Sequence, residues 1–127
     1  MSAASYLWVA AGGALGSVAR YWLAAFVGGL TGLQFPWGTL LINVLGSFVI
    51  GWFGAWTGSN GAMDVPADIR VFVMVGICGG FTTFSSFSLQ TLELLQAGEG
   101  LRAGAYILGS VTLCLLGVWA GVVWGRS

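Results

Sequence analysis

Four apolar stretches, each long enough to cross a bilayer, take up most of this 127-residue chain. They cover residues 6–27, 37–56, 69–95 and 103–124, and short polar joints separate them. A helix needs about 20 mostly apolar residues to span the hydrocarbon core, and inside lipid only helices or closed barrels satisfy their own backbone hydrogen bonds. The pattern predicts an all-α membrane protein whose single domain, residues 1–127, consists of four transmembrane helices.

Charged residues are too scarce for most soluble functions. Only 6% of the chain is charged and the net charge is zero, so no basic surface is available to bind nucleic acid. Histidine is absent, and no aspartate or glutamate lies deep within an apolar stretch. General acid–base and nucleophilic mechanisms therefore lack their groups, and the chain is not predicted to be an enzyme.

The four arginines do not specify one orientation in the membrane. Cytoplasmic loops normally collect Lys and Arg, but Arg70 and Arg126 fall on one side of the predicted bundle and Arg20 and Arg102 on the other. A single orientation with a weak bias is one interpretation. The balanced count favours insertion in both orientations and an antiparallel homodimer. Arg20 is expected near the end of its span, where its side chain can reach the headgroups.

Small residues recur at four-residue spacing on three of the predicted spans, a pattern that lets helix backbones approach closely. Some of these faces must pack within one subunit, and whether all of them do is left open by the sequence. A pathway between two subunits is favoured over one inside a single thin bundle. The residues are Gly12, Gly16, Ser47, Gly51, Gly117, Gly121 and Gly125.

Uncharged polar residues are the only candidates for chemistry inside the membrane. Amides and hydroxyls cost less to bury than ions, and they can offer hydrogens to an anion without holding it permanently. Each could instead bond a nearby backbone carbonyl, and Asn43 needs either a partner or a ligand. Tyr106, Ser110 and Cys114 form one stripe on the fourth predicted helix. The other hydroxyls of interest lie in the third span: Thr82, Thr83, Ser85, Ser86 and Ser88.

The third span contains the unusual segment GICGGFTTFSSFS, residues 76–88. Two adjacent glycines weaken the helix just where Thr82 and Thr83 can compete for backbone hydrogen bonds, so we expect it to break between Gly79 and Thr83. The freed carbonyls need a partner, and two such breaks near a dimer axis could hold one small monovalent cation. Phe84 and Phe87 could present positive ring edges to an anion, although ordinary packing is the alternative.

Three segments resemble the signature segments of the Fluc or CrcB family of microbial fluoride channels. They are GGALGSVARYW, WGTLLINVLGSFVIG and GGFTTFSSFS, at residues 12–22, 37–51 and 79–88. The resemblance implies passive fluoride export through two pores of an antiparallel dual-topology homodimer, with a central structural sodium. It also implies a multi-pass protein of a prokaryotic cell (inner) membrane.

The resemblance also implies roles for individual residues. Asn43 matches the pore asparagine, Phe84 and Phe87 match the paired pore phenylalanines, and the carbonyls of Gly79 and Thr82 match the sodium ligands. Further positions of the ion pathway and the first-helix arginine are Thr39, Thr83, Ser85, Tyr106, Ser110 and Arg20.

Two residues depart from the family pattern as it is expected here. Gln90 stands where a glutamate is expected, and Cys114 stands where a hydroxyl often continues the fourth-helix stripe. The first puts in doubt any step that needs a carboxylate near the pore, and the second weakens one end of the stripe.

Taken together, these patterns predict a fluoride-selective passive channel whose partners are fluoride, a second copy and membrane lipid. Asn43 and the hydroxyls would replace part of the ion's hydration shell, supported by phenylalanine edges. A proton-coupled exporter of small cations or drugs is an alternative, but it needs an acid that the first span lacks. A non-conducting assembly protein is another, and for it Asn43→Ala would leave ion flux unchanged.

Overall fold

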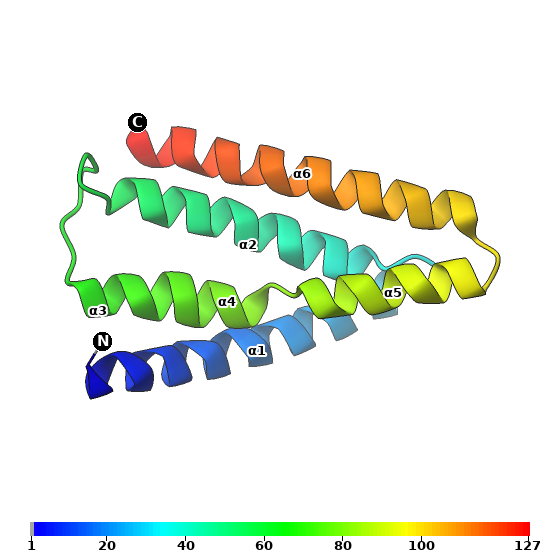
Figure 1. Cartoon of the computed structure of the whole chain (residues 1–127), viewed down its shortest axis with the longest axis horizontal. Coiled ribbons are helices and arrows are strands. Elements are labelled where there is room, and N and C mark those ends of the chain that lie inside the picture. The colour runs from blue at the N-terminus through cyan, green and yellow to red at the C-terminus, as the bar shows by residue number, and fades with distance from the viewer. Residues whose placement is uncertain (1) are drawn as a thin grey trace.

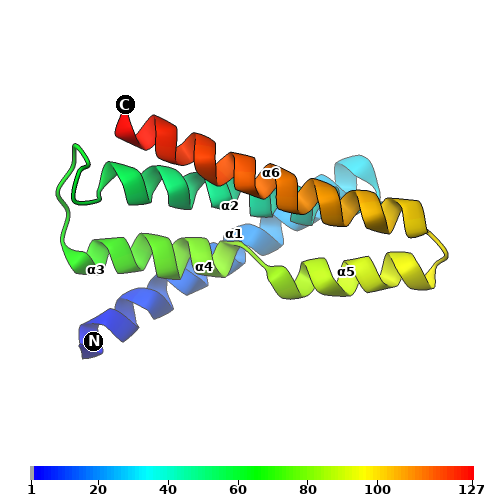
Figure 2. The same cartoon turned by 45° about the horizontal axis from the view of Figure 1, so that its top comes forward.

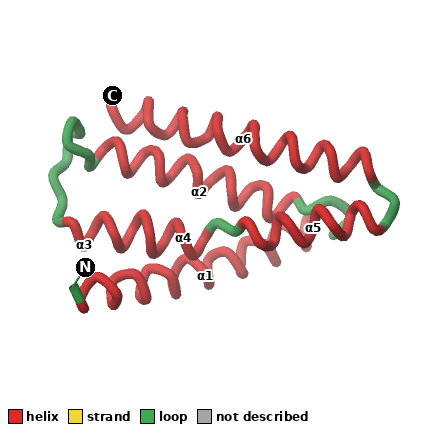
Figure 3. The backbone as a smooth tube through the Cα atoms, in the orientation of Figure 1, coloured by secondary structure: helices red, strands yellow, loops and turns green. Residues whose placement is uncertain are grey.

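A computed structural model describes residues 2–127, and all regular structure in that range is helical. Four rods lie side by side, with the chain termini at one end and the turn between α5 and α6 at the other (Figure 1). The third rod is composite, as the tube in Figure 3 shows by its break near the middle. The elements are α1 (Ala3–Thr31), α2 (Trp37–Trp56), α3 (Ala67–Arg70), η1 (Val71–Ile77), α4 (Cys78–Phe81), α5 (Phe84–Gln96) and α6 (Gly100–Arg126).

Three of the rods are long and apolar enough to cross a membrane: Trp37–Trp56, Ala67–Gln96 and Gly100–Arg126. The first rod, α1, also has the length, at 29 residues, but its Tyr, Trp, Gly and Ser residues and Arg20 lower its hydropathy. The structure therefore agrees with a helical membrane protein, with α1 the least apolar of the expected spans.

Glycines set the distance between neighbouring rods. A Cβ atom on Gly12 of α1 would lie 2.5 Å from the Phe72 carbonyl oxygen and 2.9 Å from the Gly76 Cα atom. A Cβ on Gly121 of α6 would overlap the carbonyl oxygen of Phe48 on α2. Other glycines at four-residue spacing meet a neighbouring helix of the same chain in the same way, namely Gly16, Gly51, Gly117 and Gly125. These glycine faces are thus used inside the subunit.

The third rod begins with a change of helical type. In η1 the turns are wide, and the Cys78 N–H donates to the Val73 carbonyl five residues back. Arg70, just before η1, donates from Nη1 to the carbonyl of Gly54 at 3.3 Å and to the Thr57 hydroxyl. A basic side chain at a helix C-terminus satisfies carbonyls that have no partner in the helix. Arg70 therefore ties the end of α2 to the start of the third rod.

A small cluster of buried side chains joins α5 to α6 near the turn between them. Leu94, Ala103 and Tyr106 are buried, and Phe35 and Phe87 are among the half-buried residues that pack against them. The view in Figure 2 shows α5 and α6 running together from this end toward the middle of the bundle. The cluster fixes Tyr106 between the rods.

We expect Gly121→Ala to lower the free energy of unfolding by about 1–3 kcal/mol, because the added methyl group overpacks the contact between α6 and α2. Gly104→Ala is the matched control, since a Cβ at Gly104 on the same helix meets nothing within 4 Å. The control should be neutral or stabilising by up to about 1 kcal/mol. Thermal unfolding in detergent measures both, and equal stability of the two variants would contradict the packing argument.

Candidate functional site

The centre of the bundle holds a break in the third rod. Thr82 and Thr83 are extended, with φ/ψ of −82/157° and −151/117°, between the end of α4 and the start of α5. The break lies within the predicted range, but Gly79 and Gly80 remain helical in α4. The helix is thus interrupted at the two threonines, where the sequence predicts competition for backbone hydrogen bonds, and not at the glycines. Gly80 is instead needed for contact, because a Cβ there would lie 2.6 Å from the Gly13 carbonyl oxygen.

Asn43 of α2 spans the break with both ends of its amide. Its Nδ2 donates to the Thr83 carbonyl at 3.0 Å, and its Oδ1 accepts from the Thr83 N–H at 2.8 Å. Its Oδ1 thus replaces the backbone acceptor that a continuous helix would supply to the Thr83 N–H, and its Nδ2 adds a second bond to the Thr83 carbonyl at the start of α5. The amide nitrogen carries a second hydrogen, for which the described residues supply no acceptor. Asn43 has a structural partner and also keeps a free donor.

Most hydroxyls at the break bond locally. The Thr82 hydroxyl donates to the Cys78 carbonyl at 2.9 Å. The Thr83 hydroxyl accepts from the Ser86 N–H at 3.1 Å, so it caps α5, and it lies 3.3 Å from the Ser85 hydroxyl. Side chains that bond nearby backbone groups stabilise a helix end. For these residues the alternative stated in the sequence analysis, a hydrogen bond to a nearby backbone group, is confirmed.

An open cavity of about 350 Å³ lies beside the break. We call it the Asn43 cavity. It is lined by α2, α6 and the third rod from η1 to α5, and it brings together predicted residues that are far apart in the sequence. The predicted residues among its lining are Asn43, Gly79, Thr82, Thr83, Phe84, Phe87 and Ser110, with Cys114 beside them.

Ser110 is the one side chain among the described residues with a buried polar atom that lacks a hydrogen-bond partner. It is only 6% exposed, and it lines the Asn43 cavity. A buried hydroxyl without a partner costs about 1–3 kcal/mol, so each one calls for an explanation. The hydroxyl therefore keeps a hydrogen-bonding capacity that no described residue uses, at the border of the cavity.

The two phenylalanines of the cavity differ in exposure. Phe87 is half-buried against Tyr106, with ring centroids 5.0 Å apart. Phe84 is 78% exposed, and its ring centroid lies 5.5 Å from that of Phe87. The cavity therefore has one apolar wall that the chain itself leaves largely uncovered.

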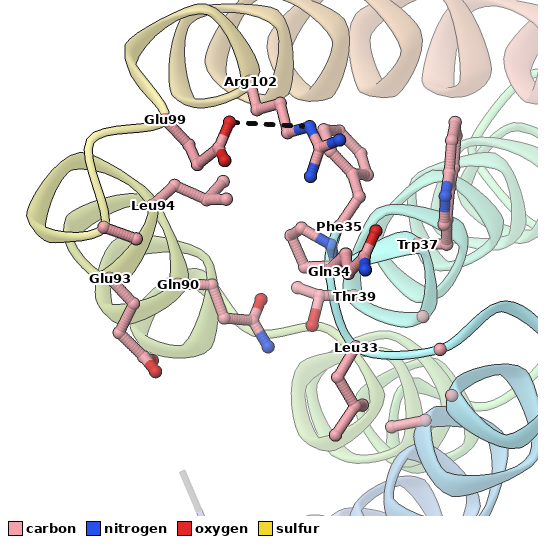
Figure 4. A pocket seen from close by; sticks show the side chains of 16 residues that line it. Leu33, Gln34, Phe35, Trp37, Thr39, Gln90, Glu93, Leu94, Glu99 and Arg102 are labelled. Atoms are coloured by element: carbon pink, nitrogen blue, oxygen red, sulfur yellow. Dashed lines mark ion pairs between the residues drawn. The ribbon is translucent and has the colours of Figure 1, made fainter.

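A second open cavity, of about 760 Å³, lies between the start of α2 and the end of α5. We call it the Gln90 cavity. Figure 4 shows the end of the Gln90 side chain pointing into it, across from Thr39. The exposed ion pair of Glu99 and Arg102, with N···O of 3.7 Å, stands at its edge. This cavity holds the charged groups of the site.

Tyr106 connects the two cavities without lining either of them. It is fully buried, and its hydroxyl donates to Gln90 Oε1 at 2.9 Å. The sequence marked Gln90 only as a departure from a family pattern and missed this bond. No local signal could have revealed it, because the two residues meet across the turn between α5 and α6.

The remaining predicted residues lie elsewhere. Thr39 lines the Gln90 cavity, and Ser85 lines neither cavity. Arg20 does not reach the end of its helix, since α1 continues to Thr31, and its Nε donates to the Gly80 carbonyl at 3.0 Å. The expectation of an arginine extended to the headgroups is corrected to an arginine bound inside the bundle. Sequence analysis also missed Gly46, where a Cβ would overlap the Thr82 side chain.

No group of three or more His, Cys, Asp or Glu side chains comes together within residues 2–127.

Comparison with known proteins gives consistent results. The family described as "CrcB-like protein, Camphor Resistance (CrcB)" matches residues 7–122. A protein of Rhodospirillum rubrum named "Fluoride-specific ion channel FluC" is 60% identical over 94% of this chain and 92% of its own length. Proteins of the same name from Methylocella silvestris and Opitutus terrae are 59% and 57% identical. They cover 93% and 91% of this chain, and 90% and 88% of their own lengths.

We expect Asn43→Asp to destabilise the protein by at least about 1–3 kcal/mol, because a carboxylate cannot donate to the Thr83 carbonyl and would place an acceptor oxygen against it. Denaturation in detergent measures the loss, and hydrogen exchange should be faster at the first amides of α5. Asn60→Asp, an identical change at an exposed loop position, is the control. Unchanged exchange in α5 would show that the Asn43 amide does not hold the break.

Proposed function

The chain belongs to the CrcB family, whose model covers residues 7–122, and we propose that it is a fluoride-selective passive ion channel. It is a multi-pass membrane protein of a prokaryote, and its family is one of channels and not of enzymes. The choice of fluoride as the ion rests on the relatives, which are named as fluoride-specific ion channels. The mechanism rests on the residues of the Asn43 cavity.

The observation that carries the proposal is the unpartnered hydroxyl of Ser110. Asn43, whose amide keeps a free hydrogen, lines the same cavity as the rings of Phe84 and Phe87. These donors are neutral, so they replace water around an anion without trapping it. Phenylalanine ring edges carry partial positive charge and support the ion where donors are sparse.

Rigidity explains the proposed selectivity. Asn43 is fixed by two bonds to Thr83, so its remaining hydrogen points in a fixed direction. Closely spaced donors that cannot move apart suit a small ion such as fluoride and exclude larger chloride. We infer that the Asn43 side chain both holds the backbone at the break and takes part in selecting the ion.

We propose that two copies assemble as an antiparallel dual-topology homodimer with two pores. The exposed ring of Phe84 supports this proposal, since a second copy would cover it. The arginines also agree. With Arg20 bound inside the bundle, Arg70 and Arg126 lie at one end and Arg102 at the other, which leaves only a weak bias.

We propose that a structural sodium ion sits at the centre of this dimer, held by the carbonyl oxygens of Gly79 and Thr82. Two bonds near the break support their availability. The Thr83 N–H, which would reach Gly79 in a continuous helix, donates to Asn43. The Ser86 N–H, which would reach Thr82, donates to the Thr83 hydroxyl. A hard cation that binds oxygen ligands would give these carbonyls a partner and would add positive charge beside the anion path.

We expect Ser110→Ala to lower fluoride efflux from liposomes by about three- to tenfold, because one donor worth about 0.5–1.5 kcal/mol is lost from the pathway. Its stability should not fall, because the hydroxyl has no protein partner to lose. Ser88→Ala is the control, since that hydroxyl is exposed and bonds the Phe84 carbonyl.

Chloride-loaded vesicles test selectivity in the same assay. Absence of fluoride efflux from wild-type vesicles would overturn the channel proposal. Unchanged efflux from Ser110→Ala and Phe84→Ala would instead show that the ion does not pass through the Asn43 cavity.

The assembly is tested by adding a Ser127→Cys substitution at the chain end and labelling it with an impermeant thiol reagent. We expect about equal labelling from each side of native membranes, with the wild-type chain as the blank. Replacing sodium with a bulky organic cation should reduce the fraction of dimer, because the carbonyls of the break lose their ion. Labelling from one side only would contradict dual topology, and an unchanged dimer fraction would contradict the sodium site.

A further inference from the structure

Both cysteines of the chain line the Asn43 cavity, and the mechanism proposed above uses neither of them. Cys78 belongs to α4 and is 3% exposed, while Cys114 belongs to α6 and is half-buried. Met74 of η1 lines the same cavity. Three sulfur-bearing side chains from two different rods therefore border one space of about 350 Å³.

The two thiols are not used to hold the fold together. Both are free within residues 2–127. Ser110 lies one helical turn before Cys114 on α6, and its buried hydroxyl, 6% exposed, also has no partner. The same stretch of α6 thus borders the cavity with a sulfur and an oxygen that the described residues leave unpaired. Unused groups of this kind in one cavity point to a species that occupies it.

The methionine is placed close to the third rod's cysteine. Met74 and Cys78 are four positions apart on that rod, and both border the cavity. The methyl end of Met74 packs against α2, because a Cβ atom on Gly54 would lie 3.0 Å from Met74 Cε and 3.8 Å from its sulfur. The thioether is therefore held between the third rod and α2, at the wall of the cavity.

The chemistry of these groups selects one class of ligand. Thiolate and thioether sulfurs are soft donors that favour soft metal ions such as Cu⁺, and Ag⁺ belongs to the same class. A structural Zn²⁺ site needs four ligands, usually from Cys, His or carboxylates. No three such residues come together within residues 2–127. The cavity therefore suits a soft monovalent ion that is satisfied by two sulfurs.

We propose that Cys78 and Cys114 form a shared site for a soft monovalent metal ion, Ag⁺ or Cu⁺, with the Met74 thioether as an additional ligand. At each cysteine the S–H bond breaks as a bond from sulfur to the metal forms, and the proton passes to water. No atom is oxidised or reduced in this exchange. Two thiolates and one monovalent cation leave the site with a net charge of −1.

This charge gives the site an effect on ion flux, an effect that rests on the channel function proposed above. The other groups of the cavity are neutral, so an anion in the empty cavity meets no negative charge. A metal complex with a charge of −1 repels an anion, and the repulsion is strong where little water screens it. The bound metal therefore closes the pathway through the Asn43 cavity.

The site itself is tested by counting bound silver with native mass spectrometry, in detergent and in a chloride-free buffer because silver chloride precipitates. We expect one Ag⁺ per wild-type chain and no retained Zn²⁺. Cys78→Ser and Cys114→Ser should each lower the affinity by at least about tenfold, because each removes a ligand. Met74→Leu should have a smaller effect. Met63→Leu is its control, since Met63 is exposed and lies outside both cavities.

Two results of this count would overturn the shared site. One is two silver ions per wild-type chain with one kept in each single serine variant, which would show two independent thiols. The other is silver that stays bound to the variant that lacks both cysteines.

The effect on flux is tested with fluoride efflux from liposomes, each protein being compared with itself before silver is added. Wild-type efflux should fall about tenfold or more and recover with excess dithiothreitol, while the variant without cysteines should keep its own rate. Protein-free vesicles report any leak that silver causes in the lipid. Bound silver with unchanged wild-type efflux would overturn the closure of the pathway. Wild-type vesicles that pass no fluoride before silver would instead overturn the channel function, and the count of bound silver still decides the metal site.

Discussion

The amide of Asn43 is the contact on which the centre of this protein depends. A bilayer offers no water to an interrupted helix, so the backbone groups of Thr83 must find partners inside the protein. Asn43, on a helix 40 positions earlier in the chain, accepts from the Thr83 N–H, which α5 leaves without a partner, and donates to the Thr83 carbonyl as well. The direction of α5 after the break, and with it the placement of Phe84 and Phe87, follows from this pair of bonds.

The broken rod is supported from two sides. On the side of α1, Arg20 bonds the carbonyl of Gly80, and Gly80 packs directly on Gly13. On the side of α2, Asn43 holds Thr83, and Gly46 leaves room for the Thr82 side chain. Two extended residues at the middle of the third rod are thus held from two sides, and the cavity beside them is lined by α2, α6 and the third rod.

Local patterns were enough to predict the rods but not their contacts. Hydropathy alone gave the range 37–56, which coincides with α2, because apolar length is a property of one segment. The break was expected in the right place, but the sequence did not show that Gly80 packs against Gly13 of α1. Whether a glycine unwinds a helix or packs against another one depends on the neighbouring helix, which a single segment does not reveal. The bond between Gln90 and Tyr106 escaped notice for the same reason.

The glycines buried between the rods also determine where the sequence is free to change. At Gly12, Gly16 and Gly121 even a methyl group would meet backbone atoms of the adjacent helix. The outward surface carries large apolar side chains such as Leu15, Leu108 and Trp119, all more than half exposed. Substitutions on the outward surface, including those that adapt the protein to bilayers of different thickness, are therefore tolerated more easily than substitutions of the glycines between the helices.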